Sequence, residues 1–208
     1  MPGRAAAQAE HPWPRPATVD MPSGKDLKRL QSGEVLLESM DTRHGGAARV
    51  QAIFMAKPEA IWDKIASCET NFIYIDGLRE CEVLELSPTY SRTRQVIKKN
   101  WFTPAMDFTF EARRTPYSHI EFRLVSGDLK KMSGSWVLTP MDQGRETLLT
   151  HVIELQPSLP APRWLVRSTL VHDLPDMVAC LRWLAHGSLT PKQVPEDRDR
   201  CPNPPAKN

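Results

Sequence analysis

The feature that most constrains the fold of this chain is a change in its hydrophobic period. Between residues 79 and 155 the apolar residues recur at every second position, most clearly in Ala105–Arg113, and polar turns separate the stretches. From Trp164 to Leu184 they recur instead at steps of three and four. A period of two indicates a strand with one buried face, and a period near 3.6 indicates an amphipathic helix. The order therefore predicts a run of antiparallel strands followed by one long helix.

The stretches before and within this run set the expected fold class. An alternating stretch, Ala48–Met55, precedes a helix that opens at Pro58, where the missing N–H has no helical partner, and a short helix or turn over Thr70–Ile75. The later strand-like stretches are Arg79–Leu86, Arg92–Trp101, Ala105–Arg113, His119–Val125, Ser133–Thr139 and Thr147–Leu155. We predict an α+β fold in which a curved antiparallel sheet of about six or seven strands wraps around the long C-terminal helix, with one or two short helices after the first strand.

The distribution of the 19 prolines predicts the domain boundaries. Prolines are concentrated in residues 1–25 and 188–208. Because proline cannot donate a backbone hydrogen bond, we expect both ends to be disordered and residues 26–187 to form one domain. Pro175 lies inside the C-terminal helical pattern, where it removes one backbone hydrogen bond, so we expect a kink or a break there.

Charge and cysteine spacing argue against several classes of protein. Lys and Arg number 27 against 25 Asp and Glu, which is too balanced for a protein that wraps DNA. The four cysteines contain no Cys-x-x-Cys pair, so we expect buried or incidental thiols and neither a zinc cluster nor a disulfide framework. The six histidines include no helical i,i+4 pair of the kind that binds zinc. We therefore expect no metal and no cofactor.

The hydropathy pattern predicts a protein that does not cross a membrane, because no run of about 18 apolar residues occurs. The printed N-terminus lacks the apolar core of a secretory signal, which predicts a cytoplasmic protein. Ala7-Gln8-Ala9 has the small-x-small pattern of a signal-peptidase site, so periplasmic export is the alternative if the true start lies upstream.

Three local sequences resemble those of a known superfamily. They are Ala56–Trp62 at the start of the first helix, Gly127–Trp136 followed by Leu138-Thr139-Pro140, and Pro162–Val166 at the start of the last helix. Their order resembles the START-like (helix-grip, SRPBCC) superfamily over about residues 30–184, in particular its branch of polyketide cyclases/dehydrases and coenzyme-Q-binding proteins. The resemblance implies a cavity for a hydrophobic ligand between sheet and last helix. It does not choose among carriers, cyclases and regulators.

The same cavity is expected on physical grounds, because a strongly bent sheet and a straight helix cannot touch along their whole length. Small-molecule sites are mainly apolar with a few polar groups. The predicted ligand-contacting residues are Phe108, Phe110, Phe122, Trp136, His151, Trp164, Leu170, Leu174 and Met177. Each apolar member can instead be an ordinary core residue, and the sequence leaves both interpretations open.

The first functional hypothesis is the binding, transport or sensing of a small hydrophobic molecule such as a lipid, isoprenoid or polyketide. The alternative is a cyclase/dehydratase-type enzyme in which His151 is the general acid or base. For His151 itself the sequence favours the competing interpretation, a strand histidine whose hydrogen bonds are satisfied. No other catalytic residue is predicted, no DNA partner is expected, and the oligomeric state is left open.

A third hypothesis concerns the basic residues of the strand region. They are Arg92, Arg94, Lys98, Lys99, Arg113, Arg114, Lys130 and Lys131. If they share the outer face of the sheet, they suit a ribosome or an anionic membrane surface; some coenzyme-Q-binding relatives are described as ribosome-associated regulators. The competing interpretation is a solvated strand surface whose charges discourage aggregation.

Overall fold

A computed structural model of the chain describes Trp13, residues 21–42, 45–99, Trp101, 104–158, 163–186 and Cys201. The described residues form one antiparallel sheet of eight strands in the order β1-β2-β8-β7-β6-β5-β4-β3. The helices are α1 (Gly24–Gln31), α2 (Pro58–Ile65), α3 (Cys68–Tyr74) and α4 (Arg163–Ala185), with a single 3-10 turn at Asp142–Gly144. The strands are β1 (Leu36–Asp41), β2 (Gly46–Phe54), β3 (Leu78–Leu86), β4 (Tyr90–Ile97), β5 (Met106–Thr115), β6 (His119–Gly127), β7 (Leu129–Met141) and β8 (Glu146–Pro157).

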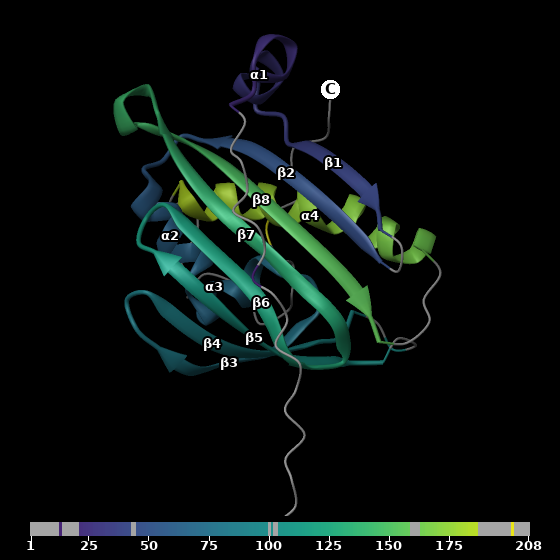
Figure 1. The fold of residues 1–208 in the computed structure, drawn as a ribbon. Coiled ribbons are helices and arrows are strands. Elements are labelled where there is room, and N and C mark those ends of the chain that lie inside the picture. Colours follow the sequence, from purple (N-terminus) through teal and green to yellow (C-terminus); the bar gives the residue numbers. More distant parts are fainter. Residues whose placement is uncertain are drawn as a thin grey trace, which may run out of the picture.

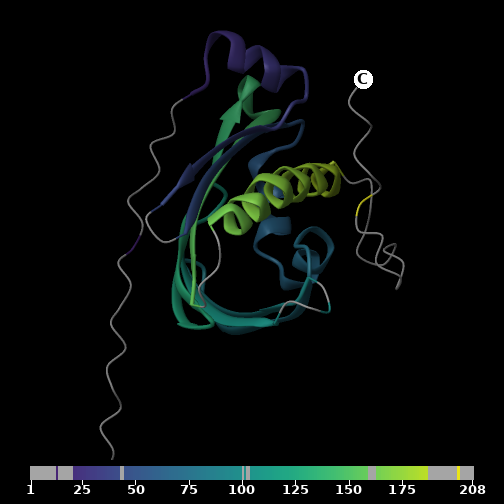
Figure 2. The same cartoon turned by 90° about the vertical axis from the view of Figure 1, so that its right-hand side faces the viewer.

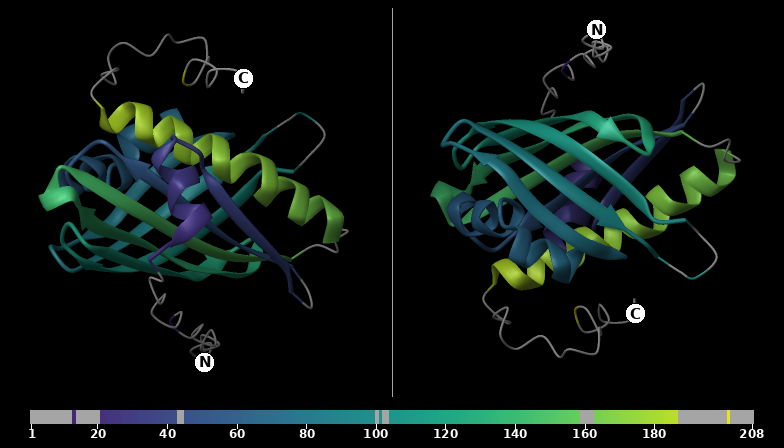
Figure 3. Two further views of the ribbon diagram at one scale, coloured as in Figure 1. Left: turned by 90° about the horizontal axis from the view of Figure 1, so that it is seen from above. Right: turned by 90° about the horizontal axis from the view of Figure 1, so that it is seen from below.

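The sheet bends into a curved layer, and α4, α2 and α3 lie on its concave side (Figures 1 and 2). Viewed from above and from below, α4 runs obliquely across the open side of the sheet (Figure 3). It packs mainly against β2 and β1 at one end of the sheet and against α2 and α3. This confirms the predicted α+β helix-grip fold.

One apolar cluster joins the concave face to α4. Its buried members include Val50 and Phe54 of β2 and Val178 and Leu181 of α4. A second, smaller cluster lies on the convex face, where Leu30 of α1 packs on residues of β2 and β8. The two clusters explain why β2 is buried along nearly its whole length, since both of its faces are covered.

Three local expectations need correction. The sheet has eight strands because Leu36–Asp41 pairs with β2 as an edge strand, although its sequence does not alternate. Helix α1 was not predicted because it is polar and only Leu30 is buried. Helix α4 continues through Pro175 without a break. Leu170 and Leu174 before the proline and Val178 after it are buried in the same cluster, which offsets the lost hydrogen bond.

The cysteines also differ from expectation. Cys68 at the start of α3 is bonded to Cys81 of β3, and Cys180 of α4 is bonded to Cys201. The partners lie 13 and 21 residues apart, and only the packing of α3 on β3 brings the first pair together. Apart from Trp13, residues 21–25 and Cys201, the ends that we expect to be disordered lie outside the described residues.

Candidate functional site

The sheet brings all five of its predicted ligand-contacting residues to the concave face. Phe108, Phe110, Phe122 and Trp136 belong to the apolar cluster of that face, and His151 lies in register with Trp136. From α4, Leu170 and Leu174 are buried in the same cluster and Met177 is partly buried against it. The side chain of Trp164 lies outside the described residues.

His151 is the most enclosed polar side chain of this group. It is 2% exposed, and its Nδ1 lies 3.0 Å from the carbonyl oxygen of Ser135. A carbonyl only accepts, so Nδ1 carries the hydrogen and Nε2 keeps its lone pair. The ring stacks on Trp136, with centroids 3.6 Å apart, and Phe122 lies 6.1 Å away. Burial lowers the pKa of His151 to about 4, against a smaller raising effect of the Ser135 hydrogen bond. The imidazole is therefore neutral at pH 7.

Several inward-facing apolar side chains of the sheet are not fully covered. Ile97 of β4, Met106 and Phe110 of β5, and Trp136 of β7 point to the concave side, yet each keeps part of its surface accessible. Helix α4 packs mainly over the opposite end of the sheet, on β1 and β2. On the concave side of β4 to β7, apolar side chains therefore keep part of their surface accessible.

Gly134 of β7 makes room for one of these rings. It is paired with Phe122, and a Cβ atom on Gly134 would lie 2.5 Å from the Phe122 Cζ and 2.1 Å from the Val152 carbonyl oxygen. Gly134, the glycine of the Gly-x-Trp sequence, is thus needed because the Phe122 ring and the backbone of β8 leave no space for a Cβ atom.

We expect Gly134→Ala to lower the free energy of unfolding by about 1–3 kcal/mol, because a backbone oxygen cannot move aside as a flexible side chain does. Urea denaturation followed by circular dichroism measures this. Gly33→Ala offers no matched control because Gly33 has a positive φ of 91°, so Ser133→Ala on the adjacent outward position is the control. A Gly134→Ala protein as stable as the Ser133→Ala protein would contradict the packing described.

Polar residues that the sequence did not predict flank the apolar surface. Thr93 and Gln95 of β4 are buried opposite Phe110 and Phe108, and the Gln95 amide lies 3.7 Å from the sulfur of Cys81. Arg114, grouped above with the surface bases, is instead paired with Ile120 on the concave face. The signal was present in the sequence, because Arg114 continues the even-numbered alternation of Phe108, Phe110 and Ala112 by one step.

Of the remaining basic residues, Arg92, Arg94 and Lys131 form ion pairs with acidic side chains of the sheet, whereas Lys98, Arg113 and Lys130 are exposed. Arg94 donates to Asp107, with Nη2 2.6 Å from Oδ2, and to Glu80 at 2.8 Å. Glu111 accepts from Tyr90 at 2.7 Å and from Arg123 at 2.6 Å. Burial raises the pKa of Glu111, but these two donors and Arg92 together hold it below its usual value. The convex side of β4 to β6 therefore carries a network of ion pairs around Arg92, Arg94 and Glu111.

Two further ion pairs join separate elements. Lys99, in the segment between β4 and β5, forms an ion pair with Asp173 of α4 and so ties the sheet to the helix. Lys131 of β7 pairs with Glu154 of β8 at 2.7 Å.

Within the described ranges no group of three or more metal-ligating side chains occurs, and no helix is long and apolar enough to cross a bilayer.

Comparison with known proteins identifies related families and folds. The family model described as polyketide cyclase/dehydrase and lipid transport matches residues 55–182. No curated protein matches the chain significantly.

Solved structures share the fold at low identity. A STAR-related lipid transfer protein from Xanthomonas axonopodis superposes with a TM-score of 0.63 at 13% identity, covering 73% of this chain and 93% of that one. Human StAR-related lipid transfer protein 5 gives 0.60 at 14% identity, covering 74% and 83%. The Zhui aromatase/cyclase from a Streptomyces species gives 0.54 at 14% identity, covering 74% and 94%. At these identities the likeness establishes the fold.

Proposed function

Because the chain belongs to the polyketide cyclase/dehydrase and lipid transport family, we propose that it binds a small hydrophobic molecule on the concave face, between the sheet and α4. The ligand is a lipid, an isoprenoid or a polyketide, and the protein acts as a carrier or sensor. The observation that carries this proposal is the set of inward apolar side chains on central strands that stay partly accessible, led by Phe110 and Trp136. We propose that Phe108, Phe122, His151, Leu170, Leu174 and Met177, which pack in or against the same core, complete the lining.

The expected affinity is modest. Burying roughly 300 Å² of apolar ligand surface contributes about 7 kcal/mol at about 25 cal/mol per Å². Association entropy subtracts about 4 kcal/mol or more. Weak to moderate, reversible binding results, which suits a protein that must release its cargo.

The test replaces one lining residue and its outward neighbour. In Phe110→Gln the lining becomes polar, whereas Thr109→Gln changes the convex face of the same strand. We expect Phe110→Gln to weaken binding of the fluorescent probe 11-(dansylamino)undecanoic acid about tenfold, since it removes about 1–2 kcal/mol of apolar contact. Thr109→Gln should bind like the parent protein. Equal effects of the two substitutions, with both proteins folded by circular dichroism, would contradict the proposed site.

The cyclase-type alternative has one supporting feature, the neutral His151 whose Nε2 can accept a proton from a bound substrate. It ranks second because the inward positions of the described strands β4 to β8 carry no carboxylate that would act as the second group. The ribosome- or membrane-associated alternative ranks third, because the convex-face arginines Arg92 and Arg94 are engaged in ion pairs.

The disulfides favour the exported alternative for the compartment. Disulfides persist in oxidising compartments and are rare in the cytosol. All described cysteines are paired. We therefore propose that the protein works in an oxidising compartment. A thiol assay on the denatured, freshly isolated protein should detect no free thiol, and free cysteines would argue for the cytoplasm.

A further inference from the structure

We propose that Arg114 anchors an anionic oxygen group, a carboxylate or a phosphate, at one end of the hydrophobic ligand. The inference rests on the function proposed above and assigns the ligand to a class, an amphipathic molecule with an apolar body and an acidic head. It follows from where the sheet places Arg114, from what surrounds its guanidinium, and from the conformation of the adjacent turn.

Arg114 begins a row of side chains that crosses the concave face. The strand registers pair Arg114 with Ile120, Ile120 with Trp136, and Trp136 with His151. Directly paired residues of an antiparallel sheet point to the same side, and neighbouring strands are about 4.8 Å apart. Arg114 therefore lies about 10 Å from Trp136, at two strand spacings, on the same surface. A ligand whose head meets Arg114 would lay its body over Ile120 and Trp136.

The guanidinium of Arg114 has an aromatic wall but no acidic partner among the described residues. Its central carbon lies 5.2 Å from the ring centre of Trp62 on α2, and within the described part of the chain the guanidinium makes no side-chain hydrogen bond or ion pair. The residue is half-buried, and burial lowers the pKa of the guanidinium, which nevertheless stays charged at neutral pH. A partly desolvated cation with unused donors favours an anionic acceptor.

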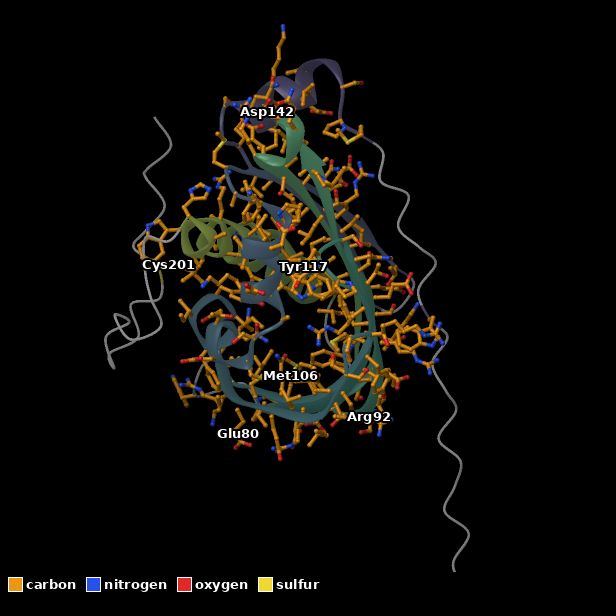
Figure 4. The ribbon with its side chains drawn as sticks, turned by 90° about the vertical axis from the view of Figure 1, so that its left-hand side faces the viewer. Glu80, Arg92, Met106, Tyr117, Asp142 and Cys201 are labelled. Atoms are coloured by element: carbon orange, nitrogen blue, oxygen red, sulfur yellow. A yellow bond between two sulfur atoms is a disulfide. The ribbon has the colours of Figure 1, made fainter. Side chains whose placement is uncertain are left out.

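The turn beside Arg114 holds a strained aromatic residue against the same wall. Tyr117 follows Pro116 and has a φ of 63°, a conformation that favours glycine. The Ser118 N–H donates to the Thr115 carbonyl at 3.1 Å and closes the turn. The Tyr117 ring meets Trp62 edge-on, with centroids 6.0 Å apart, and Figure 4 shows it between α2 and the sheet. Backbone strain of this kind is concentrated at ligand sites.

These features together describe a binding position for an acidic head. A planar guanidinium matches carboxylate and phosphate oxygens with two parallel hydrogen bonds. Trp62 and Tyr117 limit access of water to that ion pair from one side, while Ile120 begins the apolar surface on the other. The neighbouring Arg113 provides a natural contrast, because it points to the convex face and lies under the Trp13 ring at 4.1 Å.

The experiment compares three probes of equal chain length on the full-length protein: decanoate, decyl phosphate and uncharged methyl decanoate, each competing against a solvatochromic dye. The parent protein should bind at least one anionic probe about ten- to a hundredfold more tightly than the ester, as expected for charge-assisted hydrogen bonds. Whether decanoate or decyl phosphate binds more tightly identifies the head group. Arg114→Gln should lose this preference while keeping its affinity for the ester, and Arg113→Gln should keep the preference.

Each other outcome has a definite meaning. Equal binding of the three probes to the parent protein, or a preference that survives in folded Arg114→Gln, overturns the anchor and leaves the apolar site standing. Binding of none of the probes contradicts the proposed function and the anchor with it. Arg114→Lys separates charge from geometry, since a preference that the ammonium group restores only in part supports recognition by the planar guanidinium.

Discussion

Acidification from pH 7 to about pH 4 should remove about 3 kcal/mol of unfolding free energy through His151 alone. The unfolded chain binds a proton on this imidazole near pH 6.5, whereas burial in the folded protein lowers its pKa to about 4. Above pH 6.5 the imidazole is neutral in both states, so its stabilising contribution is fully present. As the pH falls from 6.5 toward 4, only the unfolded state takes up the proton, and stability is lost.

Urea denaturation at a series of pH values measures this effect in the parent protein and in His151→Gln, which keeps a hydrogen-bonding side chain but does not titrate. The substitution should flatten the pH dependence by about 3 kcal/mol. His172→Gln, on the exposed side of α4, is the control and should leave the curve unchanged. The burial described for His151 is wrong if His151→Gln and the parent protein lose stability in parallel.

Removal of the Cys68–Cys81 disulfide should cost about 3 kcal/mol of stability, because the bond closes a loop of 13 residues in the unfolded chain. It joins α3, which packs against α4, to the edge strand β3. We expect Cys68→Ser/Cys81→Ser also to loosen the edge strand β3, which pairs with Thr93 and Gln95 of β4. Thermal and urea denaturation of the double variant measure the loss.

The reduced parent protein provides the matched comparison. Reduction breaks both disulfides, so its stability should fall at least as far as that of the double variant. Cys180→Ser/Cys201→Ser isolates the second bond, which ties α4 to Cys201. A Cys68→Ser/Cys81→Ser protein with unchanged stability would show that the first bond does not form in solution.

Periodicity predicted the fold well because the elements that build it are amphipathic. The alternation of Phe108 and Phe110 and the helical repeat of Leu170 and Leu174 each have one buried face, and pattern alone locates them. Helix α1 was missed because it is short and mostly polar, and strand β1 was missed because its sequence does not alternate. The disulfides were missed because their partners meet only through tertiary packing.

The site was predictable in its apolar part and not in its polar part. The aromatic residues of β5 to β7 occupy alternate, even-numbered positions and all point to the concave face, and this alternation is visible in the sequence. The role that we propose for Arg114 depends on the strand register and on the turn at Tyr117. A charged residue at the end of a strand is normally predicted to be on the surface, and only its pairing with Ile120 places Arg114 on the concave face. The environment of His151 likewise depends on its stacking with Trp136 across β7 and β8.

The most direct test of the concave-face site is covalent capture. A palmitic acid analogue with a photoreactive diazirine in mid-chain is irradiated with the full-length protein, and the modified residues are located by tandem mass spectrometry. Adducts on inward side chains, such as Phe110, Trp136 or Met177, are the predicted result. Adducts confined to their outward neighbours Thr109, Glu111 and Val137, or spread evenly over both faces, would contradict a guest held between the sheet and α4.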